Sequence, residues 1–173
     1  MKNIRLRAPE LEDIELLYKW ENDTSIWQNG CTIAPYSINQ LTDYITSYDG
    51  DIYSAKQLRM MIDDCDTGVT VGSIDIYDYD PVNNRAFIGY LIDDKYRNMG
   101  YASSAIIKTA EYCRNRLSMR QLLAISSIDN AESISVLLKC GFTECGMLKQ
   151  WIKRESDLYV DALMMQLFLF EKP

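Results

Sequence analysis

Three stretches near the middle of the chain have the residue pattern of β-strands and follow one another closely. They cover residues 57–62, 69–77 and 85–92, and the connections between them, 66–68 and 80–84, are short and rich in turn-forming residues. Consecutive strands joined by short turns pair antiparallel, because a parallel pair requires a crossover of a dozen residues or more. The sequence therefore predicts an antiparallel meander at its centre.

The segment before this meander predicts one strand and two helices. Residues 4–7 alternate apolar and charged side chains, as a half-buried strand does. A helix is expected to begin after Pro9 and to run to about Trp20, with one buried stripe made by Leu11, Ile14, Leu17 and Tyr18. A loop follows, and Ser37 with Gln40 forms a capping box that predicts a second amphipathic helix.

The segment after the meander alternates helix and strand patterns. A helix is predicted over 100–117, and a shorter helix is capped by Asp129 or Asn130 and stopped by Gly141. Three further strands are predicted around 121–126, 142–151 and 158–170. Together the elements predict an α+β (mixed α/β) fold with one twisted, mostly antiparallel sheet flanked by about four helices.

The length of 173 residues predicts a single domain, 1–173, large enough to bury roughly 70% of its unfolded surface. The longest apolar stretch, 162–170, is much shorter than the roughly 20 residues of a membrane-spanning helix. Residues 1–7 contain no apolar block of the secretory type. We therefore expect a cytoplasmic protein with no membrane partner.

The chain contains no histidine, which excludes histidine-based nucleophile activation, histidine acid–base catalysis and imidazole metal sites. Proton transfer must use carboxylates, Tyr, Cys, Lys, an amine terminus or water. The five cysteines include no C-x-x-C pair, so neither a disulfide framework nor a zinc knuckle is suggested. We expect reduced cysteines that fill the core, and no metal.

Charge is distributed unevenly along the chain. The net charge of −7 argues against nucleic acid as a partner, because phosphate binding requires a basic surface. Residues 1–84 carry 6 basic against 15 acidic side chains, a balance of −9, whereas 85–120 have a balance of +4. This pattern suits an anionic ligand at the centre and a cation near the N-terminal half, although solvated faces with chance asymmetry would also produce it.

The stretch from Ile88 to Ala105 carries most of the chemical information. A strand runs into a loop whose Gly100 opens a helix, so the first helical amides lack intrahelical acceptors and favour an anion such as phosphate. Lys95 and Arg97 add charge, and Ser103 could reach phosphate oxygens. On these residues alone the loop is either an anion site or an ordinary turn with a glycine.

Two motifs resemble those of the GNAT (Gcn5-related) N-acetyltransferases. R-N-M-G-Y-A, residues 97–102, resembles the family's Q/R-x-x-G-x-G/A loop, and N-A-E-S-I-S-V-L-L-K-C-G-F, residues 130–142, is similar to its N-x-x-S-x-x-x-L-x-K-x-G-F segment. The first helix, with L-Y-K-W-E-N-D, resembles the branch that contains ribosomal-protein alanine acetyltransferases and spermidine acetyltransferases. The resemblance implies an acyl-CoA N-acyltransferase fold and acetyl-CoA as co-substrate.

The resemblance also implies roles for matching residues. Backbone groups of Leu91, Ile92 and Asp93 would pair with the pantetheine arm as an added strand. The pyrophosphate would be held by the amides of Arg97, Asn98, Met99, Gly100, Tyr101 and Ala102. Asn130 would bind the pantetheine or simply cap its helix. Ser133 would lie near the sulfur or be an ordinary first-turn residue, and Lys139 would meet a phosphate or remain a solvated charge.

Two positions depart from the family pattern. Phe87 stands where many members have a glutamate as general base, and Leu137 stands where many have a tyrosine as general acid. The alternative reading is therefore an acyl-CoA-binding or sensor module without catalysis. A nucleotide-binding α/β domain unrelated to CoA is disfavoured, because an antiparallel meander does not build a βαβ unit.

If the chain is an enzyme, we expect a primary amine to attack the thioester directly in a ternary complex. The candidate bases are Glu21 and Asp75, which could equally be surface carboxylates, and the candidate acids are Tyr36, Tyr90 and Tyr159. The resemblance implies that the N-terminal helices and their loop form much of the acceptor wall, so the acidic N-terminal half favours a cationic acceptor: a polyamine, an aminoglycoside-like amine or a basic N-terminal amine. A homo-oligomer is a further expectation, since some of the twelve tyrosines could serve stacking or subunit contacts, although core packing explains most of them.

Overall fold

The computed structural model describes residues 1–27, 34–48, 50–154 and 157–170. Its strands are β1 Ile4–Arg7, β2 Leu58–Asp64, β3 Thr70–Asp80, β4 Arg85–Ile92, β5 Gln121–Ser127, β6 Thr143–Lys153 and β7 Tyr159–Phe168. Its longer helices are α1 Ile14–Glu21, α3 Ile38–Ser47, α5 Tyr101–Leu117 and α6 Ala131–Lys139. Short helices are α2 Thr24–Trp27 and α4 Ile52–Ala55, with 3₁₀ turns η1 Leu11–Asp13 and η2 Asp94–Tyr96.

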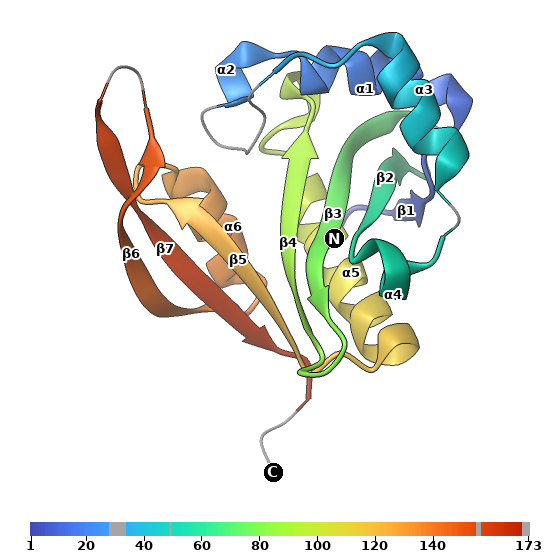
Figure 1. The fold of residues 1–173 in the computed structure, drawn as a ribbon. Helices are drawn as coiled ribbons and strands as arrows, with labels where there is room; N and C mark the ends of the chain where they lie inside the picture. The colour runs from blue at the N-terminus through green and yellow to red at the C-terminus, as the bar shows by residue number, and fades with distance from the viewer. Residues whose placement is uncertain (28–33, 49, 155–156, 171–173) are drawn as a thin grey trace.

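The seven strands form one sheet in the order β1-β2-β3-β4-β5-β7-β6 (Figure 1). Neighbouring strands are antiparallel except for β4 and β5, which are parallel. This arrangement confirms the predicted meander of β2, β3 and β4 and the mixed α+β fold with a mostly antiparallel sheet. The parallel pair is possible because α5 supplies the long crossover that such a pair needs.

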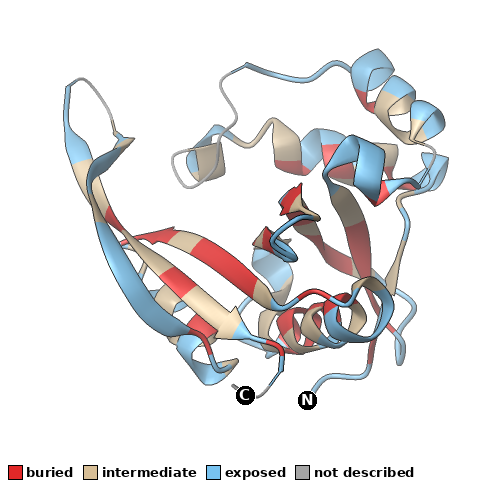
Figure 2. Cartoon of the chain, turned by 60° about the horizontal axis from the view of Figure 1, so that its bottom comes forward, coloured by how far each residue is buried: buried red, intermediate tan, exposed pale blue. Residues whose placement is uncertain are grey.

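Two layers of helices cover the sheet, and each has its own core. On one face α5 and α6 pack against the strands through a large cluster that includes Ile74, Ile88, Ile106, Leu137 and Met165. On the other face α1 and α3 cover part of the sheet through a smaller cluster of Leu17, Trp20, Leu41 and Met61. Figure 2 shows buried residues concentrated on the central strands and on α5, whereas the outer strand β6 is exposed along most of its length.

The N-terminal helices differ in detail from the sequence prediction. The capping box of Ser37 and Gln40 is confirmed, and both of its hydrogen bonds are present at the start of α3. Leu11 and Tyr18 were expected in the buried stripe of the first helix, but they are 51% and 43% exposed. Leu11 lies in a 3₁₀ turn with three residues per turn, so the helical phase of α1 does not extend to it. The prediction also missed α2 and α4, which are too short to show a periodicity.

The cysteines are only partly core residues. Cys113 is buried and Cys140 is half-buried, but Cys65 and Cys145 are exposed, which corrects the expectation that all of them fill the core. All four are free thiols, and Cys31 lies outside the described residues. No helix in the described part of the chain has both the length and the apolar composition needed to cross a membrane.

Gly72 sets how closely β3 and β4 approach. A Cβ at this position would lie 2.1 Å from the Leu91 carbonyl oxygen and 3.1 Å from the Ile92 Cα, distances that the backbone of β4 cannot accommodate without moving. Gly89 is the natural comparison on β4, because a Cβ there would meet only the Tyr77 ring at an ordinary 3.5 Å.

We expect Gly72→Ala to lower the free energy of unfolding by at least about 2 kcal/mol, because overpacking against backbone displaces β4. Urea unfolding measures this change. Gly89→Ala should change the free energy by less than about 0.5 kcal/mol. Equal effects of the two substitutions would mean that close strand approach is not the requirement at Gly72.

Candidate active site

The strands β4 and β5 are paired over only three residues each. Arg85, Ala86 and Phe87 face Gln121, Leu122 and Leu123, and beyond these residues no β4–β5 pairing occurs in the described chain. The two strands diverge from there towards the end of β4, as Figure 1 shows. Each keeps a partner on its other side, β3 for β4 and β7 for β5. The divergence therefore leaves two facing strand edges whose outward backbone groups lack a strand partner.

The hydrogen-bond register shows which backbone groups of β4 face this opening. The Asp93 N–H donates to the Val71 carbonyl at 2.9 Å, and Asp93 accepts from the Tyr96 N–H at 2.8 Å. In an antiparallel ladder successive residues direct their backbone groups to opposite sides, so Tyr90 and Ile92 face away from β3. Of the three expected pantetheine-binding positions, only Ile92 therefore faces the opening, while the backbone groups of Asp93 are engaged within the protein.

The Asp93 side chain ties the loop after β4 to helix α1. Its Oδ2 accepts from Lys19 Nζ at 2.5 Å and from Trp20 Nε1 at 2.9 Å, and its Oδ1 accepts from the Lys95 N–H at 3.2 Å. Burial by itself would raise the pKa of this carboxyl, but the hydrogen bonds from Lys19 and Trp20 outweigh burial and lower the pKa to about 2. Asp93 is thus a structural anchor for the site.

The loop and first turn of α5 present a row of amides without acceptors. In the described chain, no hydrogen bond is made by the backbone N–H groups of Asn98, Met99, Gly100, Tyr101, Ala102 and Ser103, and the first helical bond of α5 runs from the Ser104 N–H to the Gly100 carbonyl at 3.1 Å. Gly100, at φ +88°, occupies the left-handed region that favours glycine, and no side chain caps the helix. This is an anion-binding arrangement.

Several side chains of the same segment point elsewhere. Tyr101 is buried and its hydroxyl donates to Asp64 Oδ2 at 2.5 Å, a bond that, together with burial, raises its pKa to about 12. Arg97 donates to the Ile92 carbonyl at 3.2 Å and pairs with Asp94 at 2.5 Å. The exposed Lys139 belongs to the last turn of α6, whose next residue Cys140 donates to the Ser103 carbonyl at 3.7 Å. The end of α6 therefore lies near the first turn of α5, and the Lys139 side chain is exposed there.

The start of α6 lies across the opening from β4. Asn130 caps the helix, and its Oδ1 accepts from the Ser133 N–H at 3.1 Å. Two roles were considered for Asn130, pantetheine binding and helix capping, and the structure shows the helix cap. The Ser133 hydroxyl lies 3.0 Å from the Tyr90 hydroxyl, so Tyr90 reaches from β4 to α6.

The two candidate bases come together on one arginine. Arg59 of β2 donates to both oxygens of Asp75, at 2.7 and 3.1 Å, and to Oε1 of Glu21 at the end of α1. Burial of Arg59 would lower its pKa, but the charges of Asp75 and Glu21 outweigh burial and raise it. The guanidinium also lies 5.9 Å from the centre of the Tyr44 ring. Sequence reasoning missed Arg59, although a charged residue beside Met60 in an apolar strand pattern is unusual enough to indicate a buried ion pair.

The remaining candidates are separate from this cluster. Tyr159 begins β7, is 46% exposed and lies with its ring 5.9 Å from Lys153 Nζ. Phe87, at the usual base position, stacks on Tyr77 with ring centres 5.6 Å apart. Leu137, at the usual acid position, is 1% exposed and belongs to the core. Neither of these two positions can exchange a proton.

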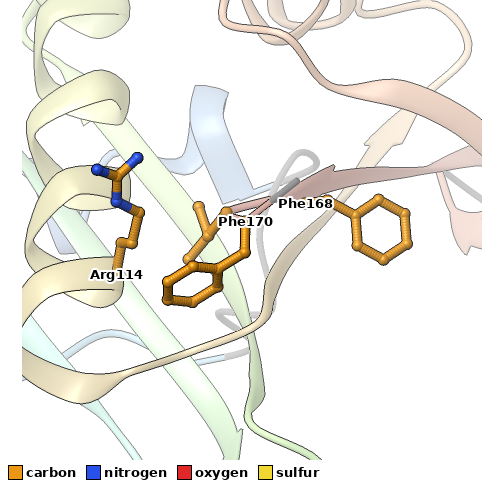
Figure 3. A pocket seen from close by; sticks show the side chains of 4 residues that line it. Arg114, Phe168 and Phe170 are labelled. Atoms are coloured by element: carbon orange, nitrogen blue, oxygen red, sulfur yellow. The ribbon is translucent and has the colours of Figure 1, made fainter. Parts of the chain in front are cut away.

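A pocket of about 520 Å³ lies near the opposite end of α5, lined by Arg114, Phe168, Leu169 and Phe170. Figure 3 shows Arg114 extending from the helix near the Phe170 ring, while the Phe168 ring points away. Arg114 is thirteen residues along α5 from Tyr101, about 20 Å at 1.5 Å per residue. This pocket is therefore distinct from the loop at the start of the helix.

We expect Asp93→Asn to lower the free energy of unfolding by about 2 kcal/mol at pH 7, since it removes the buried charge that Lys19 and Trp20 satisfy. A carboxyl with a depressed pKa stabilises the fold above its unfolded pKa of about 4, and that stabilisation is lost as the pH falls towards about 2. Urea unfolding between pH 7 and pH 2 should therefore show the difference between wild type and variant shrinking below pH 4.

Asp94→Asn is the matched control. Its side chain is 69% exposed and pairs with Arg97, so its replacement should change stability by less than about 0.5 kcal/mol at every pH. A difference for Asp93→Asn that stays constant down to pH 2 would contradict the role assigned to its charge.

Comparison with known proteins gives a consistent result. Residues 3–143 match the acetyltransferase (GNAT) domain family. L-amino acid N-acetyltransferase AaaT of Escherichia coli K12 is 28% identical over 95% of this chain and 98% of its own, and spermidine N(1)-acetyltransferase of the same organism is 25% identical over 84% and 76%. The crystal structure of Vibrio cholerae spermidine N-acetyltransferase with CoA and spermine has a TM-score of 0.83 at 20% identity, covering 96% of this chain and 95% of the other. The chain therefore belongs to the GNAT family and is an acetyl-CoA-dependent N-acetyltransferase.

Proposed function

We propose that this enzyme acetylates a primary amine on a cationic acceptor, by direct attack of the amine on acetyl-CoA in a ternary complex. The polyamine, aminoglycoside-like and basic N-terminal amines all belong to this class. The observation that carries the proposal is the position of Glu21: it ends α1, reaches β2 through Arg59, and belongs to an N-terminal half with a charge balance of −9.

The co-substrate is proposed to bind along the opening between β4 and β5. The amides from Asn98 to Ser103 would surround the pyrophosphate, and the outward backbone groups of Tyr90 and the N–H of Ile92 would pair with the pantetheine arm as a short added strand. Lys139, exposed at the end of α6, would supply positive charge near a phosphate. In this arrangement the thioester would lie beside β4, where a strand amide can hold the oxyanion.

We expect Gly100→Val to weaken CoA binding by at least about tenfold, because a β-branched residue resists φ +88° and would turn the loop amides away from the pyrophosphate. Isothermal titration calorimetry with CoA measures this change. Gly68→Val is the matched control, because Gly68 also has a positive φ of +72° and open space around it, but lies in the β2–β3 turn. If both variants bound CoA as the wild type does, the loop would not be the pyrophosphate site.

Glu21 is the better placed of the two candidate bases. Arg59 occupies both oxygens of Asp75, whereas it contacts only Oε1 of Glu21, and Oε2 has no hydrogen-bond partner in the described chain. The Glu21 side chain is 19% exposed, so solvent and substrate can reach it. We therefore assign Glu21 to receive the proton of the attacking amine, directly or through water, and Asp75 to hold Arg59 in place.

The surroundings of Asp75 also include an aromatic surface. Its cross-strand neighbour on β4 is Gly89, which has no side chain, and the next pair on the same face is the stacked Tyr77 and Phe87. An aromatic surface next to carboxylates suits an extended cation with apolar segments. Spermidine and spermine, which appear in the names of relatives, are extended cations of this kind. An amino acid, which appears in the name of AaaT, would instead require a cation to bind its carboxylate.

An acceptor panel tests the proposal. Thiol release from acetyl-CoA would be followed with spermidine, an aminoglycoside, a peptide with a basic N-terminus, and neutral and acidic amino acids. We expect the highest kcat/KM for a cationic acceptor, falling at least about threefold between 20 and 300 mM salt as the acidic surface is screened. A preference for neutral or acidic amino acids would overturn it, and CoA binding without thiol release for any amine would support the non-catalytic reading instead.

Two variants separate the roles of the carboxylates. Glu21→Gln should lower kcat at least about 100-fold, the usual effect of removing a general base. Asp75→Asn keeps Glu21 and should lower kcat less, with its main effect on KM for the cationic acceptor. Full kcat in both variants across the pH range would leave neither residue as the base. A homo-oligomer and a cytoplasmic location stay predictions.

A further inference from the structure

The hydroxyls of Tyr90 and Ser133 meet across the opening between the diverging strands. The two oxygens are 3.0 Å apart, and the Tyr90 hydroxyl also lies 3.4 Å from the Ser133 carbonyl oxygen. The residues are 43 positions apart in sequence, Tyr90 on β4 and Ser133 in the first turn of α6, which follows β5. Their contact is therefore a product of the fold and not of local chain geometry.

The pair lies beside the route expected for the thioester. Tyr90 belongs to the part of β4 that β5 no longer pairs with, and its backbone groups face the opening. The Ser133 N–H donates to Asn130 Oδ1, but the Ser133 hydroxyl takes no part in this helix cap. Both hydroxyls are thus held in place by backbone elements while still able to give a proton.

The reaction requires a proton donor that the usual position does not provide. When the carbon–sulfur bond breaks, the electron pair stays on sulfur, and a thiolate leaves more easily if it is protonated. Leu137 cannot protonate it and the chain has no histidine. Tyr36 and Tyr159 are 41% and 46% exposed and have no contact with the opening among the described interactions.

Tyr90 holds a protonated hydroxyl in a partly buried position. It is half-buried and packs against the core between the sheet and α5 and α6. Burial raises the pKa of its hydroxyl, and the hydrogen bond with Ser133 offsets part of this increase, so the phenol remains protonated at neutral pH. The thiol of Cys140 is its other titratable neighbour, and that thiol donates to the Ser103 carbonyl.

We propose that Tyr90 and Ser133 form a two-hydroxyl relay that protonates the sulfur of coenzyme A as it leaves. The amine nitrogen attacks the carbonyl carbon, the carbon–sulfur bond breaks, and the hydroxyl facing the sulfur gives it a proton. The second hydroxyl replaces that proton along the 3.0 Å hydrogen bond, and solvent restores the pair. The proton lost by the amine leaves on the acceptor side, so the charges balance. The proposal needs only the acetyl-transfer reaction, whichever amine accepts.

Tyr90→Phe tests the relay through the leaving group. With acetyl-CoA we expect kcat to fall at least about 100-fold while the affinity for CoA, measured by calorimetry, changes less than about twofold. With an acetyl thioester of 4-nitrothiophenol, whose thiolate leaves without protonation, the loss should shrink to less than about threefold. An equal loss with both donors would mean that Tyr90 only shapes the site, which would overturn the proposal.

A double-mutant cycle tests independently whether the two hydroxyls act as one unit. If the hydroxyls act as one unit, Tyr90→Phe, Ser133→Ala and the double variant should lose kcat by similar factors, whereas independent roles would multiply. Tyr112→Phe, a half-buried tyrosine on α5, should retain wild-type kcat. If the two single losses of kcat multiplied in the double variant, or if both single variants kept full kcat, the relay proposal would be overturned. Rates would be measured with the best acceptor of the panel and also for hydrolysis, so that a wrong acceptor class cannot be mistaken for a failed relay.

Discussion

The structure of the site depends on the point at which β4 and β5 stop pairing. A buried or half-buried strand edge with unpaired N–H and C=O groups is costly unless water or a ligand satisfies them. Here each strand keeps a partner on its other side, β3 for β4 and β7 for β5, while the two facing edges remain unpaired with each other. The packing of α5 and α6 over the same face fixes both walls. The fold thus keeps two facing strand edges whose backbone groups have no strand partner, the kind of edge to which an extended chain can add.

The last turn of α1 connects the loop after β4 with strand β2. Lys19 and Trp20 contact Asp93, in the loop that follows β4, and the next residue, Glu21, contacts Arg59 of β2. Three consecutive residues thereby fix the end of α1 both to the loop after β4 and to strand β2. A base at Glu21 would consequently keep a constant position relative to the amides of the pyrophosphate loop, which is what attack in a ternary complex requires.

Some site residues follow from sequence, and others need the fold. The glycine at the start of α5 and the Asn130 cap are local features, since a left-handed φ and an Asx cap are decided within a few residues. The edge that each of Leu91, Ile92 and Asp93 faces could not be predicted, because strand alternation gives only alternate residues to an edge and the register was unknown. Tyr101 is in the loop motif, but its hydroxyl donates a hydrogen bond to Asp64 of β2, which is 37 positions away in the sequence.

The sequence by itself determined the antiparallel meander, the starts of α3, α5 and α6 and the row of amides after β4, because hydrogen bonding and periodicity within about ten residues decide these features. The tertiary structure alone decided that Glu21 and Asp75 share Arg59 and that Tyr90 meets Ser133. Such contacts depend on strand register and on how helices pack across the sheet. Long-range packing energies select both, and no local pattern encodes them.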